Sequence, residues 1–339
     1  MEMRHAAVLG TGAWGTTFAK VLADAGMTVT MWGRNAQVVD FIDSHENSPY
    51  LPGIDLPASI SATTDLGMAL DGAQLVAVVV PVVAVRETVE RAARLLEDDA
   101  VLLTLSKGLE PDSLSTVHEV TREASGLPAG RIAVLSGPNL SREIAEENPT
   151  ATVVACEDTD VATRIALACH NPYFRPYVSP DVVGCEIAGA TKNVIAVAIG
   201  ASEGMGLGVN TRATLITRGL AEMTRLGTAL GADPGTFLGL AGVGDLVATC
   251  SSKLSRNYSL GLRMGRGASL QEALELSPGV VEGVRSAKPV LDLAHAHGVD
   301  MPITEGVVRV VHEGATIEEM GEMLLSRPQK RDGWRIELL

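Results

Sequence analysis

Residues 10 to 15 read Gly10-Thr11-Gly12-Ala13-Trp14-Gly15, between a strand-like run from His5 to Leu9 and a helical pattern from Ala13 to Gly26. A G-x-G-x-x-G motif in that position is typical of a dinucleotide-binding turn. The first glycine permits the tight turn, the second lets a pyrophosphate approach the backbone, and the third lets helix and strand pack closely. Amides at the helix N-terminus would then bind the anion. The motif therefore predicts a dinucleotide site at the start of an α/β fold.

Two patterns divide the chain. Up to about residue 180, strand-like runs alternate with amphipathic stretches, which is typical of a parallel sheet covered by helices on both faces. From about Asp181, long helical segments rich in Ala, Leu, Gly and Met take over. We therefore predict an α/β protein with a Rossmann-type doubly wound domain over residues 1–180 and an all-α domain over residues 181–339.

The predicted strands are His5–Leu9, Thr28–Trp32, Leu75–Val80, Val101–Leu105, Ile132–Leu135 and Ala151–Ala155. The predicted helices of the first domain are Ala13–Gly26, Ala36–Ser44, Val82–Leu96, Ser113–Ser125 and Asp160–Cys169. The tail after Ser326 is predicted to be a solvated terminus. A chain of 339 residues also favours two domains, because it exceeds what one hydrophobic core usually serves.

The composition argues against several classes of protein. The formal net charge of -14 repels nucleic acid and anionic membranes, and we find no apolar run of the ~18 residues that a membrane span needs. The 4 cysteines form no C-x-x-C pair and have no histidines at metal-ligand spacing. We therefore expect a cytoplasmic protein with buried reduced thiols, a small-molecule substrate, no metal site, no nucleic-acid partner and no stable membrane insertion.

The end of the second predicted strand bears on the choice of cofactor. NAD sites usually place a carboxylate there for the ribose 2'-hydroxyl, whereas this chain has Gly33-Arg34-Asn35. A guanidinium can pair with the 2'-phosphate of NADP, which a carboxylate would repel. Arg34 therefore favours NADP, with NAD as the second cofactor, although an ordinary surface arginine also fits this position.

Two charged residues stand in apolar surroundings in the helical half. Lys192 lies in Gly189-Ala190-Thr191-Lys192-Asn193, and Asp245 follows the glycine-rich stretch Gly239 to Gly244. Desolvation lowers the pKa of a buried lysine toward a range useful for proton transfer. We therefore predict that both are catalytic, with Asp245 orienting Lys192 or binding a substrate hydroxyl. A snorkelling lysine and an aspartate that caps a helix are the structural alternatives.

An acidic chain repels a phosphate ester at long range, so a phosphate site here requires a local basic cluster. Ser255-Arg256-Asn257 supplies a hydroxyl, a guanidinium and an amide, and is the predicted phosphate-binding edge, although such a tripeptide also suits a surface loop. Lys107 follows the predicted strand that ends at Leu105, and Ser136-Gly137-Pro138 follows another. Because ligands bind at the carboxyl ends of strands in open α/β sheets, both segments belong to the predicted site.

Taken in order, these motifs resemble those of the bacterial NAD(P)-dependent glycerol-3-phosphate dehydrogenase family over essentially the whole chain. The resemblance implies an oxidoreductase that reversibly reduces dihydroxyacetone phosphate to sn-glycerol 3-phosphate, the backbone precursor of phospholipids, with NADPH or NADH. The matching segments are Gly10-Thr11-Gly12-Ala13-Trp14-Gly15-Thr16, Tyr50-Leu51-Pro52-Gly53 with Leu56-Pro57, Ser106-Lys107-Gly108, Ser136-Gly137-Pro138, Lys192-Asn193, Gly242-Val243-Gly244-Asp245-Leu246, Ser255-Arg256-Asn257 and Val281-Glu282-Gly283.

The same resemblance implies roles for individual residues. Lys192 would be the proton acceptor in the oxidation direction. The residues that would contact substrate are Lys107, Gly137, Lys192, Asp245, Ser255, Arg256 and Asn257. Those that would contact cofactor, in addition to Gly10, Gly12 and Gly15, are Thr11, Trp14, Arg34, Lys107, Ser141, Arg256, Val280 and Glu282.

Two positions depart from the family pattern. Asn139 stands where the family usually carries Ser or Thr, and we count it among the substrate-binding residues because its amide can still form a hydrogen bond. Pro81-Val82-Val83 replaces the usual Pro-Ser-Gln, which removes polar groups near the cofactor. Neither departure touches the predicted proton donor.

Two other functions fit part of the sequence. A dehydrogenase of hydroxy acids or sugar acids would share the glycine motif and a helical lysine, but Ser255-Arg256-Asn257 together with Gly244-Asp245 disfavours it. A non-catalytic NADP sensor needs Gly10 to Gly15 but has no need of Lys192 or Asp245. Oxidation of NADPH that depends on dihydroxyacetone phosphate separates the three functions. The sequence leaves open the extent of the NADPH preference, feedback inhibition and the oligomeric state, a homodimer included.

Overall fold

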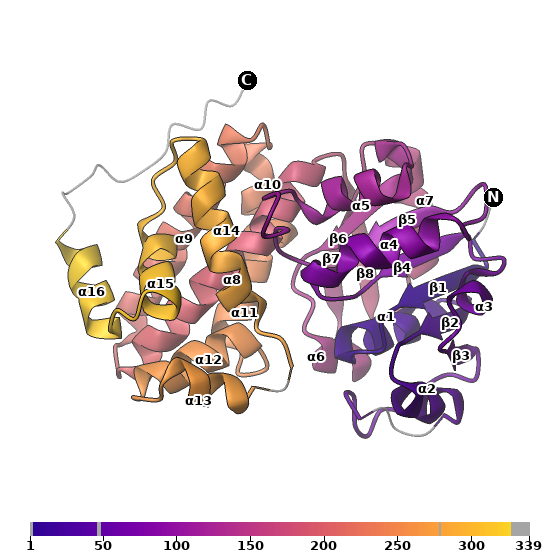
Figure 1. Cartoon of the computed structure of the whole chain (residues 1–339), viewed down its shortest axis with the longest axis horizontal. Helices are drawn as coiled ribbons and strands as arrows, with labels where there is room; N and C mark the ends of the chain where they lie inside the picture. The colour runs from indigo at the N-terminus through magenta and orange to yellow at the C-terminus, as the bar shows by residue number, and fades with distance from the viewer. Residues whose placement is uncertain (1–2, 46–48, 278, 327–339) are drawn as a thin grey trace.

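The computed structural model describes residues 3–45, 49–277 and 279–326, and consists of a part with a β-sheet beside a helical part (Figure 1). The sheet has eight strands in the order β3-β2-β1-β4-β5-β6-β7-β8. Neighbouring strands are parallel, except that β6 and β7 are antiparallel. The strands are β1 His5–Leu9, β2 Thr28–Trp32, β3 Ile60–Thr63, β4 Leu75–Val78, β5 Val101–Thr104, β6 Ile132–Ser136, β7 Thr150–Ala155 and β8 Phe174–Ser179.

Helices cover both faces of this sheet, as a mostly parallel sheet requires. One face packs against α1, α2 and α7, with Phe18 and Ile165 buried between them. The other face packs against α3, α4 and α5, with Val89 and Val120 buried. These helices and the short α6 are α1 Ala13–Asp24, α2 Ala36–Asp43, α3 Leu66–Leu70, α4 Val85–Ala93, α5 Val117–Ser125, α6 Ser141–Ala145 and α7 Thr159–Cys169. The predicted doubly wound fold is confirmed.

The second part is helical over its described residues, as predicted, with α8 at its centre (Figure 1). α9, α11, α12, α14 and α15 all pack against α8. The elements are α8 Val182–Gly204, α9 Val209–Ala229, α10 Pro234–Leu238, the π-helical turn η3 Leu240–Gly244, α11 Asp245–Ser251, α12 Arg256–Gly265, α13 Leu270–Glu275, α14 Glu282–Ala296, α15 Pro302–His312 and α16 Ile317–Leu325. We retain the division between residues 180 and 181 as our proposed domain boundary. The tail beyond Ser326 lies outside the described residues.

The prediction lacked two strands, β3 and β8, and two short helices, α3 and α6, and it started one helix too early. β3 and β8 were not expected, because β3 has only four residues, two of them hydroxylic, and β8 contains Pro176. Proline is tolerated in β8 because this is an edge strand of the sheet. The helix predicted from Ser113 begins only at Val117, since Thr116 and Glu119 form a capping box that starts it there.

Glycines let α8 and α12 approach each other closely. A Cβ at Gly200 would overlap the backbone carbonyl of Tyr258, and a Cβ at Gly261 would overlap that of Val197. Gly204 and Gly265 meet one turn further on. Because backbones in contact leave little freedom to slide, this packing fixes the start of α12 relative to α8.

α8 corrects one expectation from the sequence. By length and composition it could cross a membrane, although it contains the charged residues Glu186, Lys192 and Glu203. However, 94% of its most apolar window is buried by the surrounding helices. α8 is therefore the core helix of the second part.

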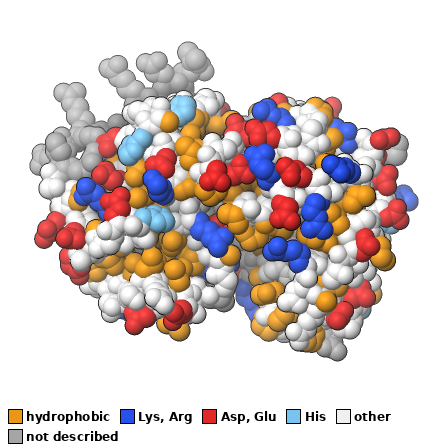
Figure 2. All heavy atoms as spheres, in the orientation of Figure 1, with side chains coloured by type: hydrophobic (Ala, Val, Ile, Leu, Met, Phe, Trp, Pro, Cys, Tyr) orange, Lys and Arg blue, Asp and Glu red, His pale blue; other side chains and the backbone are white. Residues whose placement is uncertain are grey.

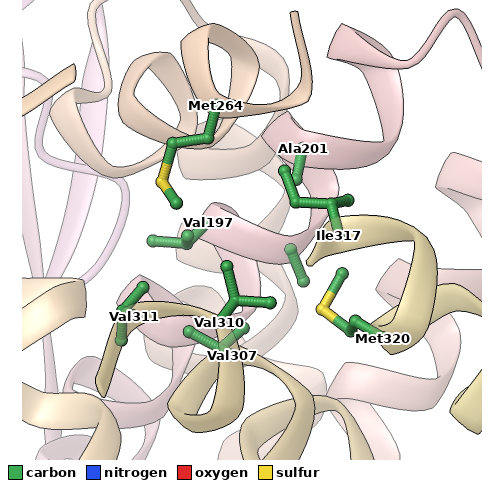
Figure 3. Close-up of a pocket in the computed structure, with 9 residues that line it drawn as sticks. Val197, Ala201, Met264, Val307, Val310, Val311, Ile317 and Met320 are labelled. Carbon is green, nitrogen blue, oxygen red and sulfur yellow. The ribbon is translucent and has the colours of Figure 1, made fainter. Parts of the chain in front are cut away.

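The helical part also has a small apolar pocket at the meeting of α8, α12, α15 and α16 (Figure 3). Its lining residues are aliphatic or methionine, among them Val197, Met264 and Met320. A lining without polar groups cannot orient a polar ligand, so we assign this pocket no binding role. The outer surface differs, because acidic and basic side chains are interspersed over the face in Figure 2, which is notched where the two parts meet.

Candidate active site

Lys192 lies in the middle of α8 and is 7% exposed. Its ammonium group donates hydrogen bonds to the Asp245 carboxylate, at 2.7 Å from Nζ to Oδ1, and to the Thr249 hydroxyl, at 2.7 Å. A snorkelling lysine would carry its charge into water, whereas this one ends on buried partners. The geometry therefore favours a paired, functional lysine over the structural alternative.

Asp245 begins α11 directly after η3. Its carboxylate does not cap that helix, because the N-cap residue is Gly244 and forms no side-chain capping bond. Instead Oδ1 accepts from Lys192 and Oδ2 accepts from Lys107 at 2.6 Å. The structure thus places Asp245 between two lysines that the sequence separates by 85 positions.

Lys107 reaches this cluster from the sheet. It follows β5, and its Nζ donates to Asp245 and to the Gly137 carbonyl, the latter at 3.1 Å. The aliphatic stem of Lys107 lies against α8 at Gly189, where an added Cβ would meet the Lys107 Cγ at 3.3 Å. Lys107, predicted at the carboxyl edge of the sheet, and Lys192, predicted in the helical part, therefore belong to one site.

Burial and charge set the protonation of the cluster. Burial lowers the pKa of Lys192 to about 8, against the opposing attraction of Asp245, and the Lys107 charge lowers it further. Burial alone would raise the pKa of Asp245, but Lys107 and Lys192 hold it below its usual value. Two ammonium groups around one carboxylate leave a net positive charge that suits an anionic or electron-rich substrate atom.

Sequence reasoning missed Thr249. Its hydroxyl accepts from Lys192 and donates to Asp245 Oδ1 at 3.1 Å, so it fixes the orientation of both. Thr249 stands four residues after Asp245 on the same helix, and side chains at that spacing lie on one face. This spacing was the available signal.

The predicted phosphate-binding tripeptide forms the start of α12. Ser255 is the buried N-cap residue and accepts from the Tyr258 amide at 3.3 Å. The Asn257 amide group bridges two neighbouring helices, because it donates to Asn193 on α8 and accepts from the Gly283 amide on α14, both at 2.8 Å. Arg256 is exposed. This segment is therefore a fixed helix start with an exposed guanidinium, and not a loose surface loop.

Gly137 and Asn139 lie beyond the end of β6. Gly137 contributes its carbonyl oxygen to Lys107. Asn139 donates from Nδ2 to the Thr152 hydroxyl at 3.1 Å, and that hydroxyl donates in turn to the Ser136 carbonyl. The Asn139 Oδ1 atom is buried and has no partner among the described residues.

The glycine motif has the geometry of a dinucleotide turn. Gly10 has φ +134°, and a Cβ there would overlap the Val79 carbonyl. A Cβ at Gly15 would overlap the Gly10 carbonyl, whereas one at Gly12 would meet nothing within 4 Å. The open space lies at the N-terminus of α1, where no side chain caps the helix. The residues therefore fit a pyrophosphate at Gly12.

The other predicted cofactor contacts surround this turn and the start of α14. Thr11 lies against Gly33 at the end of β2, and the exposed Arg34 follows. The Trp14 ring lies beside that of Phe18 at a tilt of 55°, and the carbonyl of Ser141 accepts from Thr17 on α1. The segment from Gly279 through Val280 to Glu282 runs beside Arg256, since a Cβ at Gly279 would meet Arg256 Nη1 at 3.1 Å. The structure thus collects these residues into two groups, one at α1 and one at the start of α14.

Two further motifs are structural in this fold. Leu51 of the Tyr50-Leu51-Pro52-Gly53 segment is 2% exposed and packs with Ile54 and with Ala145 of α6. In the departing Pro81-Val82-Val83 segment, Val82 is buried in the core while Val83 is 58% exposed. The all-apolar replacement therefore places one valine in the core and one at the surface.

The described part of the chain was compared with the requirements of a metal site and of a reactive thiol. Over residues 3–45, 49–277 and 279–326, no group of three His, Cys, Asp or Glu is arranged to hold a metal ion. The four cysteines are buried and free. Burial raises the pKa of Cys185 and of Cys250 to about 12, so these thiols stay protonated near neutral pH.

Two family models match the chain. The model described as NAD-dependent glycerol-3-phosphate dehydrogenase N-terminus matches residues 5–162. The model described as NAD-dependent glycerol-3-phosphate dehydrogenase C-terminus matches residues 181–322. Together they cover strands β1 to β7 of the sheet part and most of the helical part.

Named proteins are similar to nearly the whole chain. The glycerol-3-phosphate dehydrogenase (NAD(P)+) of Streptomyces griseus is 56% identical over 326 residues, which are 96% of this chain and 97% of that protein. The corresponding protein of Corynebacterium kroppenstedtii is 53% identical over 328 residues, 96% and 99% of the two chains. The crystal structure of glycerol-3-phosphate dehydrogenase from Coxiella burnetii matches with a TM-score of 0.91 at 36% identity, over 96% of this chain and 99% of that one.

Proposed function

Because the chain belongs to the NAD-dependent glycerol-3-phosphate dehydrogenase family, we propose that it reversibly reduces dihydroxyacetone phosphate to sn-glycerol 3-phosphate with NADPH or NADH. The product is the backbone precursor of glycerophospholipids. The observation that carries the proposal is the buried Lys107–Asp245–Lys192 cluster at the carboxyl edge of the sheet. Such a cluster has a use in a dehydrogenase and none in a protein that only senses NADP.

The cluster suits protonation of a ketone oxygen. When bound, the reduced nicotinamide would supply a hydride to C2 of the ketone. Lys192 as the ammonium uses two N–H groups on Asp245 and Thr249, which leaves the third for the oxygen that gains negative charge. In the oxidation direction the neutral Lys192 amine takes the proton from the alcohol. Asp245 orients Lys192 in both directions.

The phosphate group would bind at the start of α12. Arg256 offers an exposed guanidinium there, and the helix N-terminus favours an anion. Ser255 and Asn257 hold this helix start in place, and we propose that they contact the substrate as well. Lys107 and Gly137 border the same site from the sheet, and Asn139 retains an unused carbonyl acceptor for a substrate hydroxyl.

The cofactor would bind across the turn at Gly10, Gly12 and Gly15. We propose that Thr11 and Trp14 contact it beside α1, and that Lys107 and Arg256 contact it from the substrate side. The remaining proposed contacts are Arg34, Ser141, Val280 and Glu282. Arg34 supports a preference for NADPH over NADH, since no described ion pair occupies its guanidinium.

Arg34→Asp should weaken NADPH binding by about 1–3 kcal/mol, because it removes a charged hydrogen bond and sets a carboxylate against the 2'-phosphate. NADH binding should change less. Dissociation constants for both cofactors, from quenching or enhancement of nicotinamide fluorescence, test this. Arg94→Asp makes the same charge change at the end of α4, at the opposite edge of the sheet, and should leave both constants unchanged. Equal losses for both cofactors in Arg34→Asp would contradict the role.

The pH dependence should have opposite signs in the two directions. The Lys192 pKa of about 8 lies below the ordinary lysine value of 10.5, and reduction requires the ammonium form. The kcat for reduction should therefore fall as pH rises through about 8, and the kcat for oxidation should rise through the same range. Profiles measured at saturating substrate and cofactor in both directions check this. If kcat changed in the same direction with pH for reduction and for oxidation, Lys192 would not be the titrating group.

The proposed function is tested by NADPH consumption with dihydroxyacetone phosphate. We expect oxidation that depends on this ketone and stops when it is omitted. A parallel assay with 2-keto acids addresses the rival hydroxy-acid dehydrogenase, and activity with those alone would replace the proposal. No ketone-dependent oxidation with any substrate would indicate a cofactor-binding protein without catalysis.

Several finer properties accompany this proposal. We propose a cytoplasmic location, which suits four buried free thiols and an acidic surface. We also propose a homodimer, for which the exposed apolar side chains of Leu207, between α8 and α9, and of Val209, at the start of α9, would suit a contact. Small-molecule substrate and cofactor are the only other partners that the proposal requires.

A further inference from the structure

A second buried carboxylate lies on α8, six residues before Lys192. Glu186 is 5% exposed, and its Oε2 atom accepts from the backbone amide of His118 at 2.9 Å. The Thr116 side chain and the Val117 amide are further hydrogen-bond partners of the same carboxylate. Glu186 forms no ion pair with any described Lys or Arg. A carboxylate buried without a cation is costly, so its partners deserve a functional account.

The two amides are the first of α5. Within α5, the capping box pairs the Thr116 amide with the Glu119 side chain and the Glu119 amide with the Thr116 side chain. The amides of Val117 and His118 remain for an outside acceptor. Glu186 supplies it from α8 and places a negative charge at the positive end of α5. The contact therefore joins the helical part to the sheet part.

α5 begins where the Lys107 loop ends, and we call residues 105–116 the Lys107 loop. This loop is fixed on the sheet side because the Ser106 hydroxyl donates to the Val80 carbonyl and Arg86 donates to Glu110 at 2.8 and 2.6 Å. On the α8 side, Leu109 is buried with Ile187 and Ala190. The polar contact from α8 to the end of this loop is that of Glu186.

We propose that Glu186 is a positioning residue for the reaction: by binding the N-terminus of α5, it fixes the Lys107 loop against α8 and so sets the geometry of the Lys107–Asp245–Lys192 cluster. The inference rests on the proposed function. Glu186 acts through Lys107 and Lys192, since its own partners are the backbone amides of Val117 and His118 and the side chain of Thr116, all at the start of α5. Lys107 crosses α8 at Gly189, between Glu186 and Lys192 in sequence, so a shift of the loop along α8 moves the Lys107 ammonium directly.

The chain contains a matched control for this residue. Glu222 on α9 is 1% exposed and accepts from the amides of Ile303 and Thr304 at the start of α15, at 2.6 and 3.2 Å. Burial raises the pKa of both Glu186 and Glu222 to about 7. Both carboxylates thus bind a helix N-terminus from a neighbouring helix. Only Glu186 lies next to the Lys107 loop.

Glu186→Gln and Glu222→Gln should lower the unfolding temperature by similar amounts, since each sets an amide NH2 against backbone donors. Glu186→Gln should in addition lower kcat for dihydroxyacetone phosphate about tenfold, with the KM for NADPH within about twofold of the parent value. The pH at which kcat for reduction falls should also be higher than in the parent, because a displaced Lys107 no longer lowers the pKa of Lys192. Glu222→Gln should retain the parent kcat and the parent pH dependence of kcat.

The measurements are made on the full chain well below the unfolding temperature. The proposal is overturned if Glu186→Gln keeps both the parent kcat and the parent pH dependence of kcat. It is also overturned if both variants lose kcat equally and the pH at which kcat falls does not change. If Glu186→Gln does not fold, Glu186→Asp retains the charge on a shorter side chain. An unchanged kcat with an unchanged pH dependence in Glu186→Asp would equally overturn the proposal. Failure of the proposed function is a separate result, since the parent protein would then show no ketone-dependent oxidation.

Discussion

Lys192→Ala should lower turnover by about 10²–10⁴-fold, the range expected when a general acid is removed. The variant leaves the glycine turn and Arg34 untouched, so the dissociation constant for NADPH should change little. The loss should appear in kcat because the Lys192 ammonium acts on charge that develops only during the reaction. Rapid-mixing measurement of NADPH oxidation separates this chemical step from product release.

The packing around Lys192 calls for two comparisons. Lys192→Met retains much of the buried aliphatic volume without the charge and should lose as much turnover as Lys192→Ala. Lys288→Ala removes an exposed lysine on α14, whose partner Asp292 is also exposed, and should retain parent turnover. Near-normal turnover in Lys192→Met would remove Lys192 from the mechanism.

Asp245→Asn should have the second largest effect, on stability and on turnover together. Its carboxylate is the common partner of Lys107 and Lys192, and removal of one partner from a buried ion pair costs about 3–5 kcal/mol. Attraction to Asp245 raises the pKa of Lys192, so without it this pKa should fall below about 8. The pH at which kcat for reduction falls should therefore be lower than in the parent, which is opposite to the shift expected for Glu186→Gln. Turnover at pH 7 should fall by about 10²-fold, since the Lys192 side chain is neither held in position nor fully in its ammonium form.

Chemical denaturation and the pH profile of kcat measure the two effects separately. Asp292→Asn is the control, because it removes the same charge from an exposed pair on α14 and should change stability by less than about 1 kcal/mol. An Asp245→Asn variant that folds as stably as the parent and keeps the parent pH dependence of kcat would show that Asp245 does not hold the lysine.

Much of the fold was predictable because local patterns carry it. His5–Leu9 and Thr28–Trp32 are strands with the predicted bounds, since an apolar run bounded by a turn leaves little choice of register. β8 was missed because Pro176 argues against a strand until the neighbouring β7 shows that it lies at an edge. The start of α5 was placed too early because its cap depends on which hydroxyl meets Glu119.

The candidate site was predictable residue by residue but not as an arrangement. Lys192 and Asp245 are conspicuous in the sequence because charge is rare in apolar surroundings. Thr249 is an ordinary residue in sequence and gains its significance from its distance to Lys192. Similarly, the choice between capping and pairing for Asp245 required the position of Gly244.

By itself, the sequence determined the dinucleotide turn, the succession of sheet and helical parts, and the identity of the charged residues of the site, because each depends on neighbours within one turn or one strand. Only the tertiary structure decided that Lys107 and Lys192 share one carboxylate, and that Glu186 joins α8 to the helix that follows Lys107. These contacts connect residues 53 to 138 positions apart in the chain. No local pattern encodes such a pairing, since it exists only once packing of α8 against the sheet has brought the side chains together and excluded water from between them.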